Sequence, residues 1–217
     1  MTETRAVLFD LDGTFADTAP DLGYALNLQL RSRGREALPI ERIRCVASSG
    51  ARGLLGLGFD LQPDDPNYPA MTEEFLDLYE SNLCRNTRLF PGIAELLRAI
   101  EERGMRWGIV TNKARRFTLP LMRLLRLSER AACIVCGDTT AHRKPHPAPL
   151  HCAATTIGID PAACIYLGDD ERDMIAGRAA GMRVAIAEYG YLGAGNPPEN
   201  WEADLRVAHP MDLVAAF

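Results

Sequence analysis

Between residues 90 and 187, short apolar runs alternate with stretches whose apolar residues recur at helical spacing. Such alternation predicts βα units, which build a parallel sheet with helices on both faces. One further apolar run lies near the N-terminus. The predicted strands are 5–10, 106–110, 133–136, 164–167 and 183–187, and the predicted helices are 93–103, 115–127, 147–157 and 171–180. The sequence therefore predicts a Rossmann-like three-layer α/β fold.

The stretch between the first strand and residue 86 contains no clear strand pattern. Apolar spacing predicts helices over 20–33 and 72–83. Between them, the glycine-rich segment Ser48–Gly58 indicates a loop, and three prolines indicate helix breaks, at Pro63, Pro66 and Pro69. We therefore expect an α-helical cap inserted in an α/β core, with the core formed by 1–16 and 86–217 and the cap by 17–85.

Composition narrows the class of protein. The chain has 217 residues, 47% hydrophobic and 24% charged, with a net charge of −5. An acidic chain has no basic field to attract nucleic acid or an anionic membrane. No apolar run approaches the roughly 20 residues of a membrane-spanning helix, and no signal-peptide core follows the first residues. We expect a cytoplasmic protein without nucleic-acid or membrane partners, as a monomer or weak homodimer.

Neither the cysteines nor the histidines indicate a metal or disulfide site. The six cysteines of a chain without an export signal do not predict a disulfide framework. Cys133 and Cys136 form a C-x-x-C pattern, but it lies inside a predicted strand and has no second pair. His142, His146 and His151 are separated by prolines, which break the spacing that a helical histidine pair needs.

Two carboxylates follow the first predicted strand. Asp10 and Asp12 are two residues apart, so their side chains point to the same side, and Gly13 permits a sharp turn. Paired acids at the carboxyl end of a strand suit a divalent metal with nucleophilic or acid–base chemistry. Taken alone, the pattern is equally typical of a strand followed by an acidic turn.

Polar groups also follow the other predicted strands. Strand 106–110 is followed by Thr111-Asn112-Lys113, and strand 133–136 leads toward Lys144-Pro145. Strand 164–167 is followed by Gly168-Asp169-Asp170, with Asp173 one helical turn further on. Open parallel sheets bind ligands beyond the carboxyl ends of their strands. We therefore expect these groups to converge on one rim of the sheet.

The chain contains only two lysines, Lys113 and Lys144, among 24 basic residues. An ammonium is a compact point charge, whereas a guanidinium is a planar fork, so the two lysines call for specific roles. Lys144 lies in one of the strand-end motifs. Lys113 is interpreted either as a solvated charge or as a group beside a substrate.

The four motifs, taken in order, resemble those of the haloacid dehalogenase superfamily of phosphohydrolases. They are D-x-D-G-T at 10–14, a threonine after the second strand, a Lys-Pro pair, and G-D-D-x-x-D at 168–173. The resemblance spans essentially the whole chain, and the helical insert matches the family's small mobile cap. The chain looks closest to the phosphoglycolate phosphatase-like branch. Residues 188–204 also resemble bacterial phosphatases that act on N-acetylmuramic acid 6-phosphate.

The resemblance implies a role for each motif residue. Asp10 would attack phosphorus to form an aspartyl-phosphate, and Asp12 would serve as general acid and base. Thr111 would hold a phosphoryl oxygen, helped by backbone N–H groups of Leu11, Asp12 and Asn112, and Lys144 would neutralise charge. The implied Mg²⁺ ligands are the Asp10 carboxylate, the Asp12 backbone carbonyl and the Asp169 carboxylate, with Asp173, ranked above Asp170, as a nearby acid.

Cap residues would select the organic part of the substrate. Arg52, in the glycine-rich segment, is interpreted either as an exposed charge or as a group that binds the anionic tail of a substrate. The resemblance places a cap loop over the site at this point, so Ser49, Gly50 and Arg52 join Leu11, Asn112 and Lys113 as expected substrate-binding residues.

These observations predict a Mg²⁺-dependent phosphomonoesterase. The expected substrate is a small phosphate ester that also carries a carboxylate, either N-acetylmuramic acid 6-phosphate or 2-phosphoglycolate. The alternatives are a phosphatase of other sugar phosphates, a sugar phosphomutase, a dehalogenase or a non-catalytic regulator. Asp12 argues against a dehalogenase, which needs no such acid–base group. The intact motifs argue against a retired catalytic site.

Overall fold

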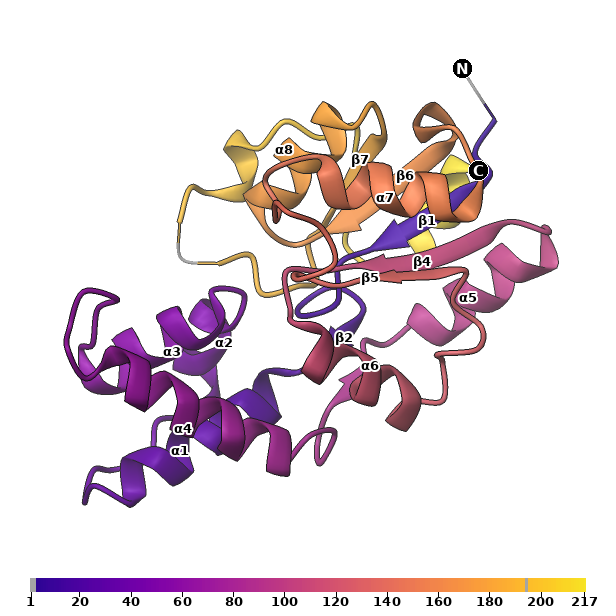
Figure 1. The fold of residues 1–217 in the computed structure, drawn as a ribbon. Helices are drawn as coiled ribbons and strands as arrows, with labels where there is room; N and C mark the ends of the chain where they lie inside the picture. The colour runs from indigo at the N-terminus through magenta and orange to yellow at the C-terminus, as the bar shows by residue number, and fades with distance from the viewer. Residues whose placement is uncertain (1–2, 194) are drawn as a thin grey trace.

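The computed structural model describes residues 3–193 and 195–217. Six parallel strands form one sheet in the order β5-β4-β1-β6-β7-β8, with β1 near the middle (Figure 1). The strands are β1 (Ala6–Phe9), β4 (Arg106–Val110), β5 (Cys133–Val135), β6 (Cys164–Gly168), β7 (Arg183–Ala187) and β8 (Leu205–Val207). The prediction of a Rossmann-like parallel α/β fold is confirmed.

Helices cover both faces of this sheet (Figure 1). Val7 and Phe9 of β1 pack in one apolar cluster with α5 (Ile93–Glu102) and α6 (Arg115–Leu124), whereas Ala6 and Leu8 pack in another with α7 (Ala148–Ile157) and α8 (Glu171–Ala179). Alternate strand residues point to opposite faces, so a strand buried on both sides is apolar throughout. Three short 3₁₀ helices complete the core: η1 (Pro161–Ala163), η2 (Pro198–Asn200) and η3 (Pro210–Ala216).

Four helices form a separate cluster at one end of the sheet (Figure 1). They are α1 (Ala19–Arg31), α2 (Ile40–Ala47), α3 (Gly50–Phe59) and α4 (Tyr68–Ser81). We call them the helical unit. The chain enters the unit through β2 (Ala16–Asp17) and returns through β3 (Arg88–Leu89), and these two short strands pair antiparallel. The division into a core and an inserted domain at 17–85 stays a prediction.

The predicted glycine-rich loop at Ser48–Gly58 is wrong, because most of this segment is helix α3. Two of its glycines, Gly53 and Gly58, serve close packing. A Cβ on Gly53 would lie 2.7 Å from the backbone oxygen of Val46, and a Cβ on Gly58 would lie 2.9 Å from a methyl carbon of Leu26. Helix propensity is a weak signal that tertiary packing overrides, so the glycine content misled the prediction.

Two other features differ from the prediction. Pro69 does not break a helix but lies in the first turn of α4, where the missing N–H of proline costs little. Strand β8 was not predicted. It has three residues, of which Val207 is buried, so its apolar pattern is too short to stand out. Within the described ranges, no helix is both long and apolar enough to cross a bilayer.

Candidate active site

The expected site residues come together at the carboxyl ends of the strands. Asp10, Thr111, Lys144 and Asp173 line one cleft, which has a volume of about 570 Å³ and is closed on its other side by the helical unit. From the helical unit, Ser49, Gly50 and Arg52 line the same cleft, as do Asp12, Asn112, Lys113 and Asp170 from the sheet edge. The structure therefore brings the sequence-predicted residues together, whereas their roles stay predictions.

Three of the acids form a cluster. One carboxylate oxygen from each of Asp10, Asp169 and Asp173 lies within 4.8 Å of the others, and all three residues are buried. The turn that follows Asp12 makes room for this cluster. Gly13 has a φ of +88°, and a Cβ there would lie 2.2 Å from an oxygen of Asp169. Only glycine meets both conditions.

Asp169 is held in place by neutral donors. Its carboxylate accepts hydrogen bonds from the Thr14 hydroxyl at 2.7 Å, the Tyr191 backbone N–H at 3.0 Å and the Ser48 hydroxyl at 3.4 Å. Burial, followed by repulsion from the other two carboxylates of the cluster, raises the pKa of Asp169 well above its usual range. Burial also raises the pKa of Asp173 to about 7.

The cluster fits a magnesium ion. Mg²⁺ prefers oxygen ligands and is bound by one or two carboxylates together with water and substrate phosphate. Three carboxylates in one buried cluster concentrate negative charge that a dication would neutralise. Asp10 and Asp169 can supply carboxylate ligands, with Asp173 beside them.

Lys144 connects two acids of the cluster. Its ammonium lies 2.8 Å from Asp10, 2.7 Å from Asp173 and 2.8 Å from the Tyr166 hydroxyl. Burial alone would lower the pKa of Lys144, but the two carboxylates outweigh it and raise this pKa. Asn112 fixes the Lys144 backbone from both sides, because its amide donates to the carbonyl and accepts from the N–H, each at 3.0 Å.

Asp12 has a different environment from Asp10. Its carboxylate lies 2.9 and 3.2 Å from the Lys113 ammonium and accepts a hydrogen bond from the Thr18 hydroxyl at 2.5 Å. The Lys113 side chain is 7% exposed, so its interpretation as a solvated charge is wrong. Lys113 thus positions Asp12, the residue expected to act as general acid and base.

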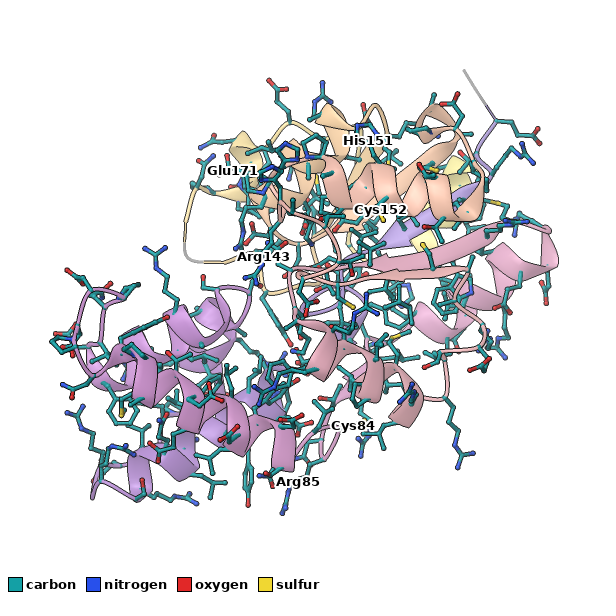
Figure 2. All side chains as sticks on the ribbon, in the orientation of Figure 1. Cys84, Arg85, Arg143, His151, Cys152 and Glu171 are labelled. Carbon is teal, nitrogen blue, oxygen red and sulfur yellow. The ribbon has the colours of Figure 1, made fainter. Side chains whose placement is uncertain are left out.

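The remaining sheet-edge residues differ in which of their groups can meet a ligand. Thr111 is buried, and its hydroxyl accepts a hydrogen bond from the Lys113 N–H at 3.2 Å. The Leu11 side chain is fully buried in the core, so only the Leu11 backbone is left to meet a ligand. Arg143 lies at the rim, facing the helical unit (Figure 2), and lines the cleft.

Several contacts join the helical unit to the sheet edge, and two of them are networks of charged groups. The Arg172 guanidinium pairs with Asp170 at 2.7 and 2.8 Å and donates to the Ser48 backbone oxygen at 2.9 Å. Asp17, in β2, accepts hydrogen bonds from Arg44 at 2.9 Å and from the Tyr191 hydroxyl at 2.8 Å. Both networks connect the helical unit to the sheet edge beside the cleft.

Sequence reasoning assigned no role to several residues that the structure places at the site. The missed residues that lie in or beside the four motifs could have been identified as site residues from their place in the sequence. A residue of the helical unit has no motif next to it that would identify it. The residues missed are Thr14, Thr18, Tyr166, Arg172 and Tyr191, together with Tyr79 of α4.

The parallel sheet is covered by helices on both faces, and an acidic cluster lies at its carboxyl edge beneath a helical unit. This combination defines a class of hydrolases with a Rossmann-like core. The chain belongs to the haloacid dehalogenase-like hydrolase family, whose model matches residues 7–187. It is 44% identical over 209 residues to the N-acetylmuramic acid 6-phosphate phosphatase of Pseudomonas putida. The alignment covers 96% of this chain and 94% of the relative.

Other relatives carry a different substrate in their names. The phosphoglycolate phosphatase of Xanthomonas campestris pv. campestris is 42% identical over 209 residues, covering 96% of this chain and 94% of the relative. Among solved structures, a predicted phosphoglycolate phosphatase from Haemophilus somnus superposes with a TM-score of 0.86 at 25% identity. That superposition covers 100% of this chain and 99% of the other. The relatives therefore agree on phosphatase activity and differ in substrate.

Proposed function

We propose that this protein is a Mg²⁺-dependent phosphomonoesterase that acts through an aspartyl-phosphate on a small phosphate ester bearing a carboxylate. The observation that carries the proposal is the environment of Asp10. One of its oxygens lies 2.8 Å from the Lys144 ammonium, in a buried cluster with Asp169 and Asp173. A carboxylate fixed in this way is oriented for attack on phosphorus.

The sheet edge supplies the groups that the reaction needs. Asp10 attacks phosphorus, and Asp12 donates a proton to the leaving alkoxide and later takes one from the hydrolytic water. Thr111 and nearby backbone N–H groups bind phosphoryl oxygens, while Lys144 offsets the charge that develops. Mg²⁺, held by Asp10, Asp169 and the Asp12 backbone carbonyl, would neutralise phosphate charge. The Lys113 ammonium, 2.9 Å from an oxygen of Asp12, positions this carboxyl group.

The substrate is inferred from the relatives and from the cleft. Relatives above 40% identity are named for N-acetylmuramic acid 6-phosphate or for 2-phosphoglycolate, and both esters carry a carboxylate. Arg52 is exposed at the cleft, where its guanidinium can pair with that carboxylate. The cleft volume of about 570 Å³ leaves room for a sugar. We favour N-acetylmuramic acid 6-phosphate.

A phosphate-release assay tests this proposal. We expect release from N-acetylmuramic acid 6-phosphate with a higher kcat/KM than from 2-phosphoglycolate or glucose 6-phosphate. Excess chelator should abolish the activity, and Mg²⁺ should restore it. Full activity in chelator would refute the metal assignment. Isomerised sugar phosphate without free phosphate would indicate a phosphomutase instead. A cytoplasmic location and a monomer or weak homodimer stay predictions.

A further inference from the structure

Tyr79 places an unpaired hydroxyl beside the cleft. It lies near the end of α4, its side chain is 1% exposed, and it lines the cleft. Its hydroxyl forms no close hydrogen bond with any described residue, and the nearby Lys113 ammonium, which only donates, leaves the hydroxyl proton without an acceptor. Three further buried side-chain atoms share this property, in Gln29, Thr72 and Ser128, but none of those residues lines the cleft.

An orphaned hydroxyl carries a cost that calls for an explanation. A buried polar group without a partner loses its hydrogen bonds to water and gains none in return. Native proteins therefore pair nearly all such groups, and an exception at a binding cleft points to a partner that arrives with the ligand. Burial raises the pKa of Tyr79 to about 12, so the phenol keeps its proton at neutral pH and can donate a hydrogen bond.

The surroundings of Tyr79 indicate which part of a ligand it meets. The Lys113 ammonium lies 4.6 Å from the centre of the Tyr79 ring, and the same ammonium holds Asp12. Asp12 is the group proposed to protonate the leaving oxygen, so Tyr79 lies beside the alcohol end of a bound ester. The Phe117 ring, 5.5 Å away, adds an apolar wall.

We propose that the Tyr79 hydroxyl is a specificity-determining donor, which binds an oxygen of the substrate's alcohol part close to the carbon that bears the phosphate. This inference rests on the proposed phosphatase function. In the free protein the hydroxyl is covered between α4 and the sheet edge. Tyr79 belongs to the helical unit and lines the cleft, so an ester bound there would supply the acceptor that the hydroxyl lacks. The class selected is an aliphatic phosphate ester with a hydroxyl, ether or carboxylate oxygen near the ester.

The test compares Tyr79→Phe with Tyr68→Phe, a control in the same helix that does not line the cleft. Each variant is assayed with the ester that the wild type hydrolyses best and with p-nitrophenyl phosphate, which has no acceptor next to its ester oxygen. For Tyr79→Phe, we expect kcat/KM to fall about tenfold or more on the first ester and to stay within about twofold on the second.

Thermal unfolding of the free variants separates this role from a structural one. Because Tyr79→Phe removes an unpaired hydroxyl, its Tm should equal or exceed that of the wild type. A Tm several degrees lower would show a partner in the free protein and overturn the proposal. Equal losses on both esters, or no loss, would overturn it as well.

A failure of the proposed function is recognised separately. If the wild type releases phosphate from no ester, that function is refuted. The two variants are then compared with the wild type by calorimetric binding of the same esters. Equal affinities of Tyr79→Phe and the wild type for the aliphatic esters would overturn the Tyr79 assignment, whereas a selective loss would support it.

Discussion

The two walls of the cleft differ in how completely their polar groups are paired. On the sheet edge, Asp10, Asp12 and Lys144 all have charged partners within 3 Å. On the helical-unit side, Arg52 is exposed and the Tyr79 hydroxyl has no partner among the described residues. The charged groups of the sheet edge are thus paired before a substrate arrives, whereas we infer that Arg52 and Tyr79 on the opposite wall acquire their partners from the substrate.

This difference has a physical origin. The sheet-edge groups follow strands that are buried on both faces, so their backbone positions are fixed by the core. Preorganised charges stabilise a transition state without reorganisation during the reaction. The helical unit packs around an apolar cluster that also includes Phe117 of α6, and it meets the sheet edge through further polar contacts. We infer that the sheet edge performs the chemistry and the helical unit selects the substrate.

Loss of the nucleophile should have the largest effect. Asp10→Asn should lower kcat at least about a hundredfold on every ester, because a neutral amide cannot attack phosphorus. Steady-state phosphate release measures the loss. The Tm of this variant should not fall, since the substitution removes one of three clustered negative charges. A variant that keeps more than about a hundredth of the wild-type rate would exclude the covalent mechanism.

The substitution Lys144→Arg should have the second-largest effect on activity. The ammonium has three partners within 2.8 Å in a buried site, which a planar guanidinium cannot replace one for one. We expect kcat to fall about tenfold or more on all esters alike. Arg172→Lys is the matched control at a half-buried arginine, where a smaller loss is expected. A loss confined to one substrate would place Lys144 in selection and break the contrast between the two walls.

Arg52→Ala tests the other wall. Removing a charge-assisted contact should cost about 1.5–3 kcal/mol, seen as a higher KM for esters that carry a carboxylate. Hydrolysis of p-nitrophenyl phosphate should change little. Arg42→Ala, an exposed arginine of α2 outside the cleft lining, is the control. Equal losses on both kinds of ester would mean that Arg52 supports the phosphate or the fold.

The smallest expected effect concerns stability and pH. Burial raises the pKa of Asp173 to about 7 and also raises that of Asp169. Between about pH 4 and 7 the folded protein therefore binds more protons than the unfolded chain, and metal-free stability should fall as pH rises. Mg²⁺ should offset this loss, so its effect on Tm should be larger at pH 8 than at pH 5.5. A larger effect at the lower pH would contradict the acidic cluster as its site.

The sheet and its rim were predictable because they follow a local rule. Polar residues at the ends of apolar runs identified Asp10, Thr111 and Asp169, since parallel strands bring their carboxyl ends to one edge. Helix α3 and strand β8 were not predicted, because packing decides the first and the second is too short. Tyr79 lies 34 residues before Lys113, and nothing in the local sequence of α4 marks their contact.

The measurement that tests the central claim most directly is rapid-quench mass spectrometry of the peptide that contains Asp10. Enzyme is mixed with substrate and Mg²⁺, quenched in acid at successive times and digested. The account predicts a phosphoryl group on Asp10 that appears before free phosphate and is absent in Asp10→Asn. Phosphate release at the normal rate, with the Asp10 peptide unmodified at every time point, would contradict it.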